Sequence, residues 1–286
     1  PTRALQAFNP SFIREEYLMP RFPKEENAPI GLVVMIPAYN EEATSAEVIQ
    51  SIPKKIEGIS SIRILVIDDG SHDLTASIAK KNGAHVVSNQ PNRGLAYSFS
   101  RGLEKALEMG ADIIVNTDAD NQYDQREIPA LIAPILKGSA DMVLGSRFRG
   151  RIEEMPLSKR WGNQLASWAV KQVSGIKITD GQTGFRAFTR EAAMKLTILS
   201  RFTYTQETIL DAADKGLIVE EIPCTFRKRN GKSRLFSGIW NYAARASSTL
   251  VMGDLKYHPV SSFGGMGFLI VAMGVLIGQP VFESFF

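Results

Sequence analysis

Two aspartates and a glutamine occupy alternate positions of segment 118–122 (DADNQ), directly after the apolar run 113–115. Carboxylate and amide oxygens suit Mg²⁺, which usually takes one or two protein carboxylates and shares its other positions with substrate phosphates. The pattern therefore predicts that Asp118, Asp120 and Gln122 hold a divalent metal on the phosphates of a nucleotide. An acidic turn that caps a helix is the alternative, because Asp and Asn favour turns.

Short apolar runs alternate with helix-like segments from residue 31 onward. The runs cover 32–36, 62–67, 84–87, 113–115 and 141–144, and the helix-like segments lie near 41–52, 73–82, 94–109 and 127–138. Strands that are apolar throughout and separated by helices predict an α/β fold with a parallel sheet covered on both faces. Ligands of such sheets bind beyond the carboxyl ends of the strands.

Polar segments follow the predicted strands, and we expect them on one edge of the sheet: 37–41, 68–71, 92–94, 118–122 and 145–147. A nucleoside needs a ring for stacking and carboxylate acceptors, which Tyr39, Glu41 and Asp69 offer. Asp69 could equally form a turn before Gly70. The sequence has neither a G-x-G-x-x-G nor a G-x-x-x-x-G-K-[ST] loop after a strand, which disfavours dinucleotide oxidoreductases and P-loop enzymes.

The composition indicates a globular protein. The chain has 286 residues, is 44% hydrophobic, and carries a formal net charge of +3, which disfavours nucleic-acid binding. Cys224 is the only cysteine, and nothing at the N-terminus has the layout of a secretory signal. We therefore expect the globular part to lie in the reducing cytoplasm.

The C-terminal part of the sequence is apolar. No charged residue occurs in 259–279, and the run 263–277 approaches the roughly 20 residues that cross a bilayer. A buried core helix is the alternative, although its glycines lower helix propensity in water and are better tolerated in membranes. We predict a transmembrane segment over 259–286 and expect the membrane region to continue beyond it.

Two amphipathic segments, 157–173 and 236–258, precede the apolar end. In the first, Trp161 and Trp168 recur at helical spacing with basic residues on the opposite side, as in helices that lie at a membrane interface. Core packing of the apolar stripe is the alternative. Three basic clusters in the second half of the chain suggest anionic ligands or an anionic membrane surface.

Five motifs resemble, in order and spacing, those of family 2 glycosyltransferases of the GT-A fold, and more narrowly those of the polyprenol-phosphate glycosyltransferases, the group of dolichol-phosphate mannose synthase. They are VMIPAYNE at 34–41, VIDDGS at 66–71, DADNQ at 118–122, GSRF at 145–148 and DGQTGFR at 180–186. The resemblance covers roughly residues 30–260 and implies a Rossmann-like GT-A domain over 31–235, while the scattered prolines and charges of 1–30, which show no sustained period, predict an extended or partly helical N-terminal arm. It places the two amphipathic segments where this group has membrane-interface helices.

The resemblance also implies functional residues. For the nucleotide-sugar site these are Pro37, Tyr39, Asn40, Glu41, Asp69, Asp118, Ala119, Asp120, Arg147 and Arg229. Asp118, Asp120 and Gln122 would hold Mg²⁺ or Mn²⁺. The residues implied for the acceptor phosphate are Arg147, Arg160, Arg229 and Ser233. The family segment R-x-x-G-x-S-K-L corresponds to 229–235 with one residue fewer before the glycine, which leaves Arg227, Lys228 and Arg229 open for the phosphate-binding role.

The implied activity is transfer of a hexose from GDP-mannose, UDP-glucose or UDP-N-acetylglucosamine to dolichyl or undecaprenyl phosphate, with inversion. A phosphate monoester has a second pKa near 6 and is mostly dianionic at neutral pH, so no general base is required. The expected catalytic residues, Asp118, Asp120 and Arg147, then act as ligands and charge stabilisers. A saccharide acceptor, or a non-catalytic membrane scaffold that binds nucleotide sugar, are alternatives. Association of the chain into a homo-oligomer through the membrane region is a further possibility that the sequence leaves open.

Overall fold

The structure is a computed structural model that describes residues 28–198 and 204–228, and four single residues at 264, 267, 271 and 273. Most of the predicted N-terminal arm lies outside the described residues. So do the predicted interface helix over 236–258 and nearly all of the predicted transmembrane segment over 259–286. Arg229 and Ser233 also lie outside the described residues.

A seven-stranded sheet with the order β3-β2-β1-β4-β6-β5-β7 forms the centre of the molecule. The strands are β1 Gly31–Ala38, β2 Ser61–Asp68, β3 His85–Ser88, β4 Ile113–Asn116, β5 Met142–Ile152, β6 Arg186–Thr189 and β7 Val219–Phe226. The neighbouring strands run parallel except β6, which is antiparallel to both β4 and β5. The predicted α/β architecture with a mainly parallel sheet is confirmed, and β6 and β7 are strands that the apolar runs do not predict.

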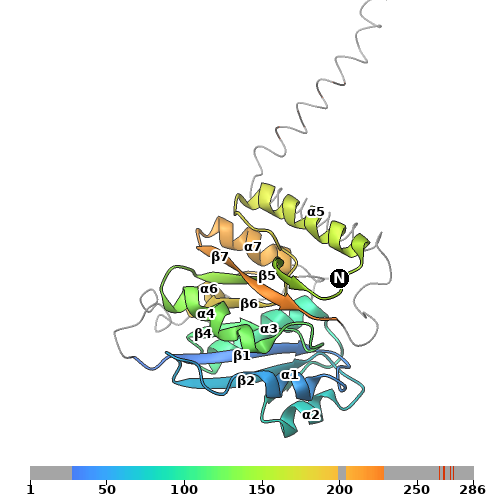
Figure 1. Cartoon of the computed structure of the whole chain (residues 1–286), viewed down its shortest axis with the longest axis vertical. Helices are drawn as coiled ribbons and strands as arrows, with labels where there is room; N and C mark the ends of the chain where they lie inside the picture. Colours follow the sequence, from blue (N-terminus) through green and yellow to red (C-terminus); the bar gives the residue numbers. More distant parts are fainter. Residues whose placement is uncertain are drawn as a thin grey trace, which may run out of the picture.

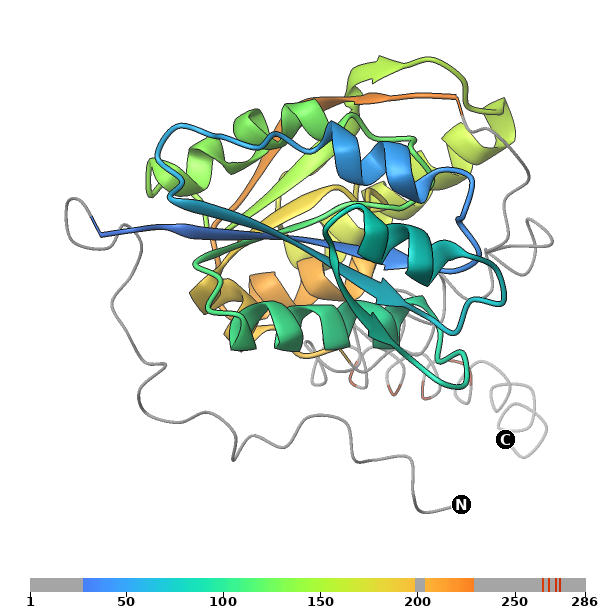
Figure 2. The same ribbon diagram turned by 90° about the horizontal axis from the view of Figure 1, so that it is seen from below.

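Helices cover both faces of the sheet (Figures 1 and 2). They are α1 Ser45–Ser51, α2 Thr75–Lys81, α3 Leu95–Glu108, α4 Ile128–Leu136, α5 Leu157–Ser174, α6 Arg190–Lys195 and α7 Thr205–Asp214, with a short 3-10 turn η3 Gln125–Glu127. Alternate residues of β1 face opposite layers: Val34 packs in the core with α1 and α4, and Val33 packs with α3 and α7. This alternation follows from the two-residue period of a strand. The parallel pairing of β1 with β2 and β4, and of β2 with β3, places the carboxyl ends of these strands on one edge.

The surface of α5 is unusual. The helix packs on α7, and its buried residues are Asn163, Ala166, Ser167 and Val170. Its large apolar side chains face outward: Trp161 is 73% exposed and Trp168 is 58% exposed. The structure therefore has a helix where the sequence predicts one, and the alternative that its apolar stripe packs in the core is wrong within the described residues.

Within residues 28–198 and 204–228, no helix combines the length and apolar character needed to cross a bilayer.

Candidate functional site

The loops after β1 and β2 are tied together at the carboxyl edge of the sheet. The backbone N–H of Asn40 donates to Ser71 Oγ at 2.9 Å, and Asn40 Oδ1 accepts from the His72 N–H at 2.8 Å. Asn40 has a φ of 53°, a left-handed conformation that asparagine tolerates better than most residues. The Glu41 N–H donates to Thr75 Oγ1 at 2.8 Å. The loops thus form one unit held by bonds from side chains to backbone.

The residues predicted for nucleoside binding occupy different positions in this unit. Pro37 is buried within β1, whereas Tyr39, just after the strand, is 36% exposed. The side chain of Asn40 serves the loop contact to His72. The structure brings these residues to the predicted edge, and their contact with a nucleoside stays a prediction.

Asp69 holds the loop that follows β3. Its buried carboxylate accepts hydrogen bonds from Asn89 Nδ2 at 2.9 Å, from the Arg93 N–H at 2.9 Å and from the Gly94 N–H at 2.8 Å. Gly70 makes the close approach of the two loops feasible: its φ is 75°, and a Cβ there would lie 3.0 Å from the Asn92 backbone nitrogen. Asp69 therefore fixes the loop 89–94 beside the loop after β2 by accepting three hydrogen bonds from it.

Asp118 and Asp120 follow β4 and are both partly exposed. Ala119 between them is buried, and its carbonyl accepts from Thr44 Oγ1 at 2.7 Å, which ties this segment to the loop after β1. Asp120 Oδ1 accepts from the Gln122 N–H at 3.1 Å. The two carboxylates therefore lie at one strand end beside the loops predicted for the nucleoside.

These residues fit a metal that is shared with a substrate. Among the described residues, no group of three or more His, Cys, Asp or Glu side chains forms a metal site by itself. Two carboxylates that leave other positions to phosphate oxygens match the usual binding of Mg²⁺. The carboxylate of Asp118 lies against the backbone of Gly184, where a Cβ would be 2.8 Å from Oδ1. Gln122 Nε2 donates to the Arg227 carbonyl at 3.3 Å, and its role as a ligand stays a prediction.

A cavity of about 530 Å³ opens beside Asp120. Its lining residues are Glu47, Ser51, Asp120, Asn121, Arg126, Glu153, Arg227 and Lys228. Arg227 pairs with Asp124 at 2.7 Å and its Nη1 lies 3.4 Å from Asn121 Oδ1, whereas Lys228 pairs with Glu154 at 2.7 Å. Of the three basic residues left open for phosphate binding, Arg227 is a described residue in direct contact with the 118–124 loop.

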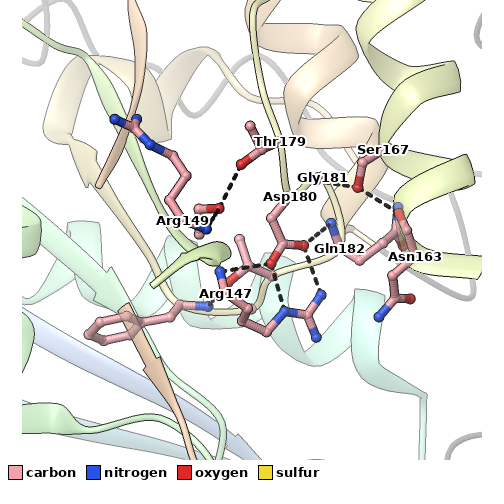
Figure 3. Close-up of polar contacts among 12 residues, drawn as sticks. Arg147, Arg149, Asn163, Ser167, Thr179, Asp180, Gly181 and Gln182 are labelled. Carbon is pink, nitrogen blue, oxygen red and sulfur yellow. Dashed lines mark hydrogen bonds and ion pairs between the residues drawn. The ribbon is translucent and has the colours of Figure 1, made fainter. Parts of the chain in front are cut away.

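Arg147 and Asp180 form a buried ion pair (Figure 3). Arg147 Nε and Nη2 donate to the two carboxylate oxygens at 2.7 and 2.8 Å, and the Arg147 N–H donates to Oδ2 at 3.0 Å. Burial alone would raise the pKa of the Asp180 carboxyl, but the Arg147 guanidinium lowers it below its ordinary value. Asp180 thus compensates much of the positive charge of Arg147. The role of Arg147 in phosphate binding stays a prediction, and it would depend on the guanidinium N–H groups that do not bond to Asp180.

The loop that carries Asp180 is fixed from β7 as well. The Glu221 carboxylate accepts from the N–H groups of Thr179 and Asp180, each at 2.8 Å from Oε1. Arg149 Nη1 donates to the Glu221 carbonyl at 2.6 Å and so serves the same contact. Arg160, predicted for the acceptor phosphate, lies exposed in the first turn of α5.

A second group of buried polar residues includes Asn116 and Arg186, and the sequence predicts no role for either, although Arg186 belongs to the 180–186 motif. Asn116 Nδ2 donates to the Gly184 carbonyl at 2.6 Å and to the Tyr204 hydroxyl at 2.8 Å. Arg186 is fully buried, with its guanidinium 5.8 Å from the centre of the Tyr204 ring. Polar residues at the ends of buried strands are the signal that could have identified Asn116 and Arg186.

Comparison with known proteins places the chain in a family. Residues 33–197 match the model of Glycosyl transferase family 2. A UDP-N-acetylglucosamine--dolichyl-phosphate N-acetylglucosaminyltransferase of Methanococcus voltae is 31% identical over 217 residues, which cover 67% of this chain and 84% of the relative. An uncharacterised protein of Methanocaldococcus jannaschii is 35% identical over 211 residues, which cover 70% of this chain and 85% of the relative.

A solved structure has the same fold. Glucosyl-3-phosphoglycerate synthase from Mycobacterium tuberculosis, crystallised with Mn²⁺, UDP and glucosyl-3-phosphoglycerate, matches with a TM-score of 0.63 over 80% of each chain. Its sequence is 22% identical, so the likeness concerns the fold alone. With the mainly parallel sheet and its flanking helices, it makes the domain a GT-A-like α/β fold. The chain belongs to glycosyl transferase family 2.

Proposed function

We propose that the protein is a membrane-associated, metal-dependent, inverting glycosyltransferase that transfers a hexose from a nucleotide sugar to polyprenyl phosphate. One observation carries the proposal: Asp118 and Asp120 follow β4, with the tied loops of β1 and β2 on one side and the Arg147–Asp180 pair on the other. The relative that acts on dolichyl phosphate supports a lipid phosphate as the acceptor.

The donor would bind across the carboxyl ends of β1, β2 and β4. The Tyr39 ring offers a stacking surface for the base, and the loops held by Asn40 and Asp69 would enclose the nucleoside. Asp118 and Asp120 would hold Mg²⁺ or Mn²⁺ on the diphosphate. The metal would neutralise charge on the leaving nucleoside diphosphate.

The reaction would be a direct displacement. An oxygen of the lipid phosphate attacks the anomeric carbon while the bond from that carbon to the nucleoside diphosphate breaks, which inverts the configuration. The phosphate is mostly dianionic at neutral pH, so no side chain has to remove a proton. The residues predicted to hold the acceptor are Arg147, Arg160, Arg229 and Ser233.

The exposed face of α5 supports the location of this acceptor. Leu157 and Trp161 are each 73% exposed and Leu165 is 67% exposed, while Arg160 lies in the same turns. Indole rings and long cationic side chains are well placed at the depth of lipid headgroups. Such a helix would keep the domain on the membrane surface where a polyprenyl phosphate is presented.

An acceptor assay tests the proposal. The full chain in detergent is given a short-chain polyprenyl phosphate and, in separate reactions, radiolabelled GDP-mannose, UDP-glucose or UDP-N-acetylglucosamine with Mn²⁺. A lipid-linked, mild-acid-labile product from one donor is expected. The absence of a lipid-linked product from every donor would contradict the lipid acceptor, and transfer to a free saccharide supplied in its place would support a family 2 enzyme with a saccharide acceptor.

A further inference from the structure

The segment 181–184 is held on its buried side by a clamp of side chains. Arg186 Nε donates to the Thr183 carbonyl at 2.7 Å, and Arg186 Nη2 donates to the Gly181 carbonyl at 3.1 Å. Asn116 Nδ2 donates to the Gly184 carbonyl at 2.6 Å. Three of the four carbonyls of this segment are therefore fixed by two buried side chains.

The N–H groups of the same segment are fixed from other elements. The Gly181 N–H donates to Ser167 Oγ of α5 at 2.9 Å, and the Gly184 N–H donates to the Tyr123 hydroxyl at 3.0 Å (the Ser167 contact is drawn in Figure 3). The segment therefore has little freedom to move relative to β4, β6 or α5.

The outward side of the segment meets the predicted metal-binding carboxylate. A Cβ added to Gly184 would lie 2.8 Å from Asp118 Oδ1 and 2.9 Å from Oδ2. Real Cβ contacts are longer than this, so the carboxylate occupies the space that any other residue at this position would fill. The position of Gly184 thus limits where the Asp118 carboxylate can lie.

Holding this segment with Arg186 requires the burial of a charged side chain. Within the described part of the chain, its hydrogen-bond acceptors are two carbonyls and the Thr208 hydroxyl, which accepts from Nη1 at 2.6 Å, and none of these carries a charge. Burial lowers the pKa of Arg186 to about 10, so the guanidinium remains charged at neutral pH. Burying a charge whose hydrogen-bond partners are all neutral costs stability, whereas the fixed fork of donors of Arg186 holds several carbonyls at once.

We propose that Arg186, acting through segment 181–184, is a positioning residue for the Asp118 carboxylate, and that Gly184 is the point of contact. This inference rests on the proposed function, because Asp118 matters as a ligand only if a metal and a nucleoside diphosphate bind there. Residues that orient metal ligands without touching the metal typically change metal affinity by about 10- to 100-fold when they are replaced.

Two substitutions separate positioning from stability. Gly184→Ala requires only that the end of a flexible carboxylate moves, so it should displace Asp118 and leave the melting temperature nearly unchanged. Arg186→Lys keeps the charge but cannot donate from a planar fork to two carbonyls and a hydroxyl. Arg190→Lys is the matched control, because Arg190 also donates to a carbonyl, that of Ala111 before β4, at the opposite end of the strand.

The test measures binding of UDP and of GDP to the full chain by calorimetry, with Mn²⁺ and with a chelator. For the nucleotide that the wild-type protein binds, Gly184→Ala and Arg186→Lys should each weaken binding about tenfold or more in Mn²⁺ and leave metal-free binding unchanged. Arg190→Lys should behave as wild type. If Arg186→Lys does not fold, Thr208→Val removes one of its acceptors and should weaken Mn²⁺-dependent binding in the same direction.

The outcomes distinguish the two proposals. Metal-dependent binding by the wild-type protein that the folded variants retain at full affinity overturns the inference and leaves the proposed function intact. A wild-type protein that binds neither nucleotide with Mn²⁺ overturns both.

Discussion

The two halves of the carboxyl edge are built by different kinds of contact. On the β1–β3 side, comprising the loops 38–44, 68–75 and 89–94, side chains such as Asn40 and Asp69 bind backbone N–H groups of neighbouring loops. On the β4–β7 side, comprising 116–123, 145–149 and 179–186, two guanidinium groups are buried: Arg147 pairs with Asp180, and Arg186 is enclosed among carbonyls.

This difference matches the chemistry proposed for each half. Recognition of a nucleoside needs donors, acceptors and a stacking surface, which loops can supply at modest cost. Stabilising a leaving diphosphate and a second phosphate needs groups that are already oriented before reaction, because fixed charges in a dry environment do not reorganise during the reaction. We therefore expect the β4–β7 side to be the more rigid half, and the burial of its charged groups to cost more folding free energy.

The largest effect on stability should come from the buried pair. Asp180→Ala leaves the Arg147 guanidinium buried without its counter-charge, which should lower the free energy of unfolding by about 3–5 kcal/mol. Urea unfolding followed by circular dichroism measures the change. The control is Glu108→Ala, which breaks the exposed pair with Lys105 and should cost less than about 1 kcal/mol. Equal effects of the two substitutions would contradict the comparison.

The pH dependence of stability should report the same pair. Because the pKa of Asp180 is lowered in the folded state, its contribution is complete above the unfolded pKa of about 4 and is lost as the pH falls toward the lower folded value. The stability difference between wild type and Asp180→Asn should therefore be constant above about pH 5 and shrink in more acidic solution. A stability difference that does not change down to about pH 2 would contradict the contribution of Asp180 ionisation to stability.

A smaller effect is expected on the β1–β3 side. Asp69→Asn replaces one acceptor by an N–H₂ group that faces backbone donors and removes the charge from three hydrogen bonds. The cost should be about 1.5–3 kcal/mol, measured by urea unfolding. We also expect faster hydrogen exchange in 89–94 than in 181–184. Faster exchange in 181–184 would show that the rigid half has been misassigned.

The smallest effect should come from the link between the halves. Thr44→Val removes the hydrogen bond from Thr44 Oγ1 to the Ala119 carbonyl and keeps the shape of the side chain. Stability should fall by about 1 kcal/mol, because the hydroxyl loses its short hydrogen bond to this carbonyl together with its longer contacts to the Glu41 carbonyl at 3.5 Å and carboxylate at 3.3 Å. The variant should bind nucleotide more weakly only when Mn²⁺ is present, since Ala119 lies between the two carboxylates. Binding that weakens equally in chelator would mean that Thr44 serves the nucleoside loops alone.

Local sequence signals predict the β1–β3 side well. The apolar runs of β1 to β5 and the turn residues that follow them place Tyr39, Asp69 and Asp118 at one edge without knowledge of distant contacts. The strands β6 and β7 lack such signals. β6 is four residues long and begins with Arg186, and β7 contains Glu220, Glu221 and Pro223, which disfavour a strand assignment.

The β4–β7 side depends on contacts between distant residues. Arg147 and Asp180 are 33 positions apart, and Asn116 and Tyr204 are 88 apart. The spacing of these residues does not predict that Arg147 forms a buried ion pair with Asp180. On α5 the buried residues are Asn163, Ala166, Ser167 and Val170 while Trp161 is exposed, and a helical period alone does not reveal which side of the helix is buried.

The most direct test of the account is the rate of sugar transfer to polyprenyl phosphate by Asp120→Ala. Asp120 is partly exposed at the end of β4, so the variant should keep the melting temperature and circular dichroism spectrum of the wild-type protein. We predict that transfer falls to background at every Mn²⁺ concentration. Transfer at near wild-type rate by the folded variant would contradict the claim that the carboxylates after β4 hold the donor.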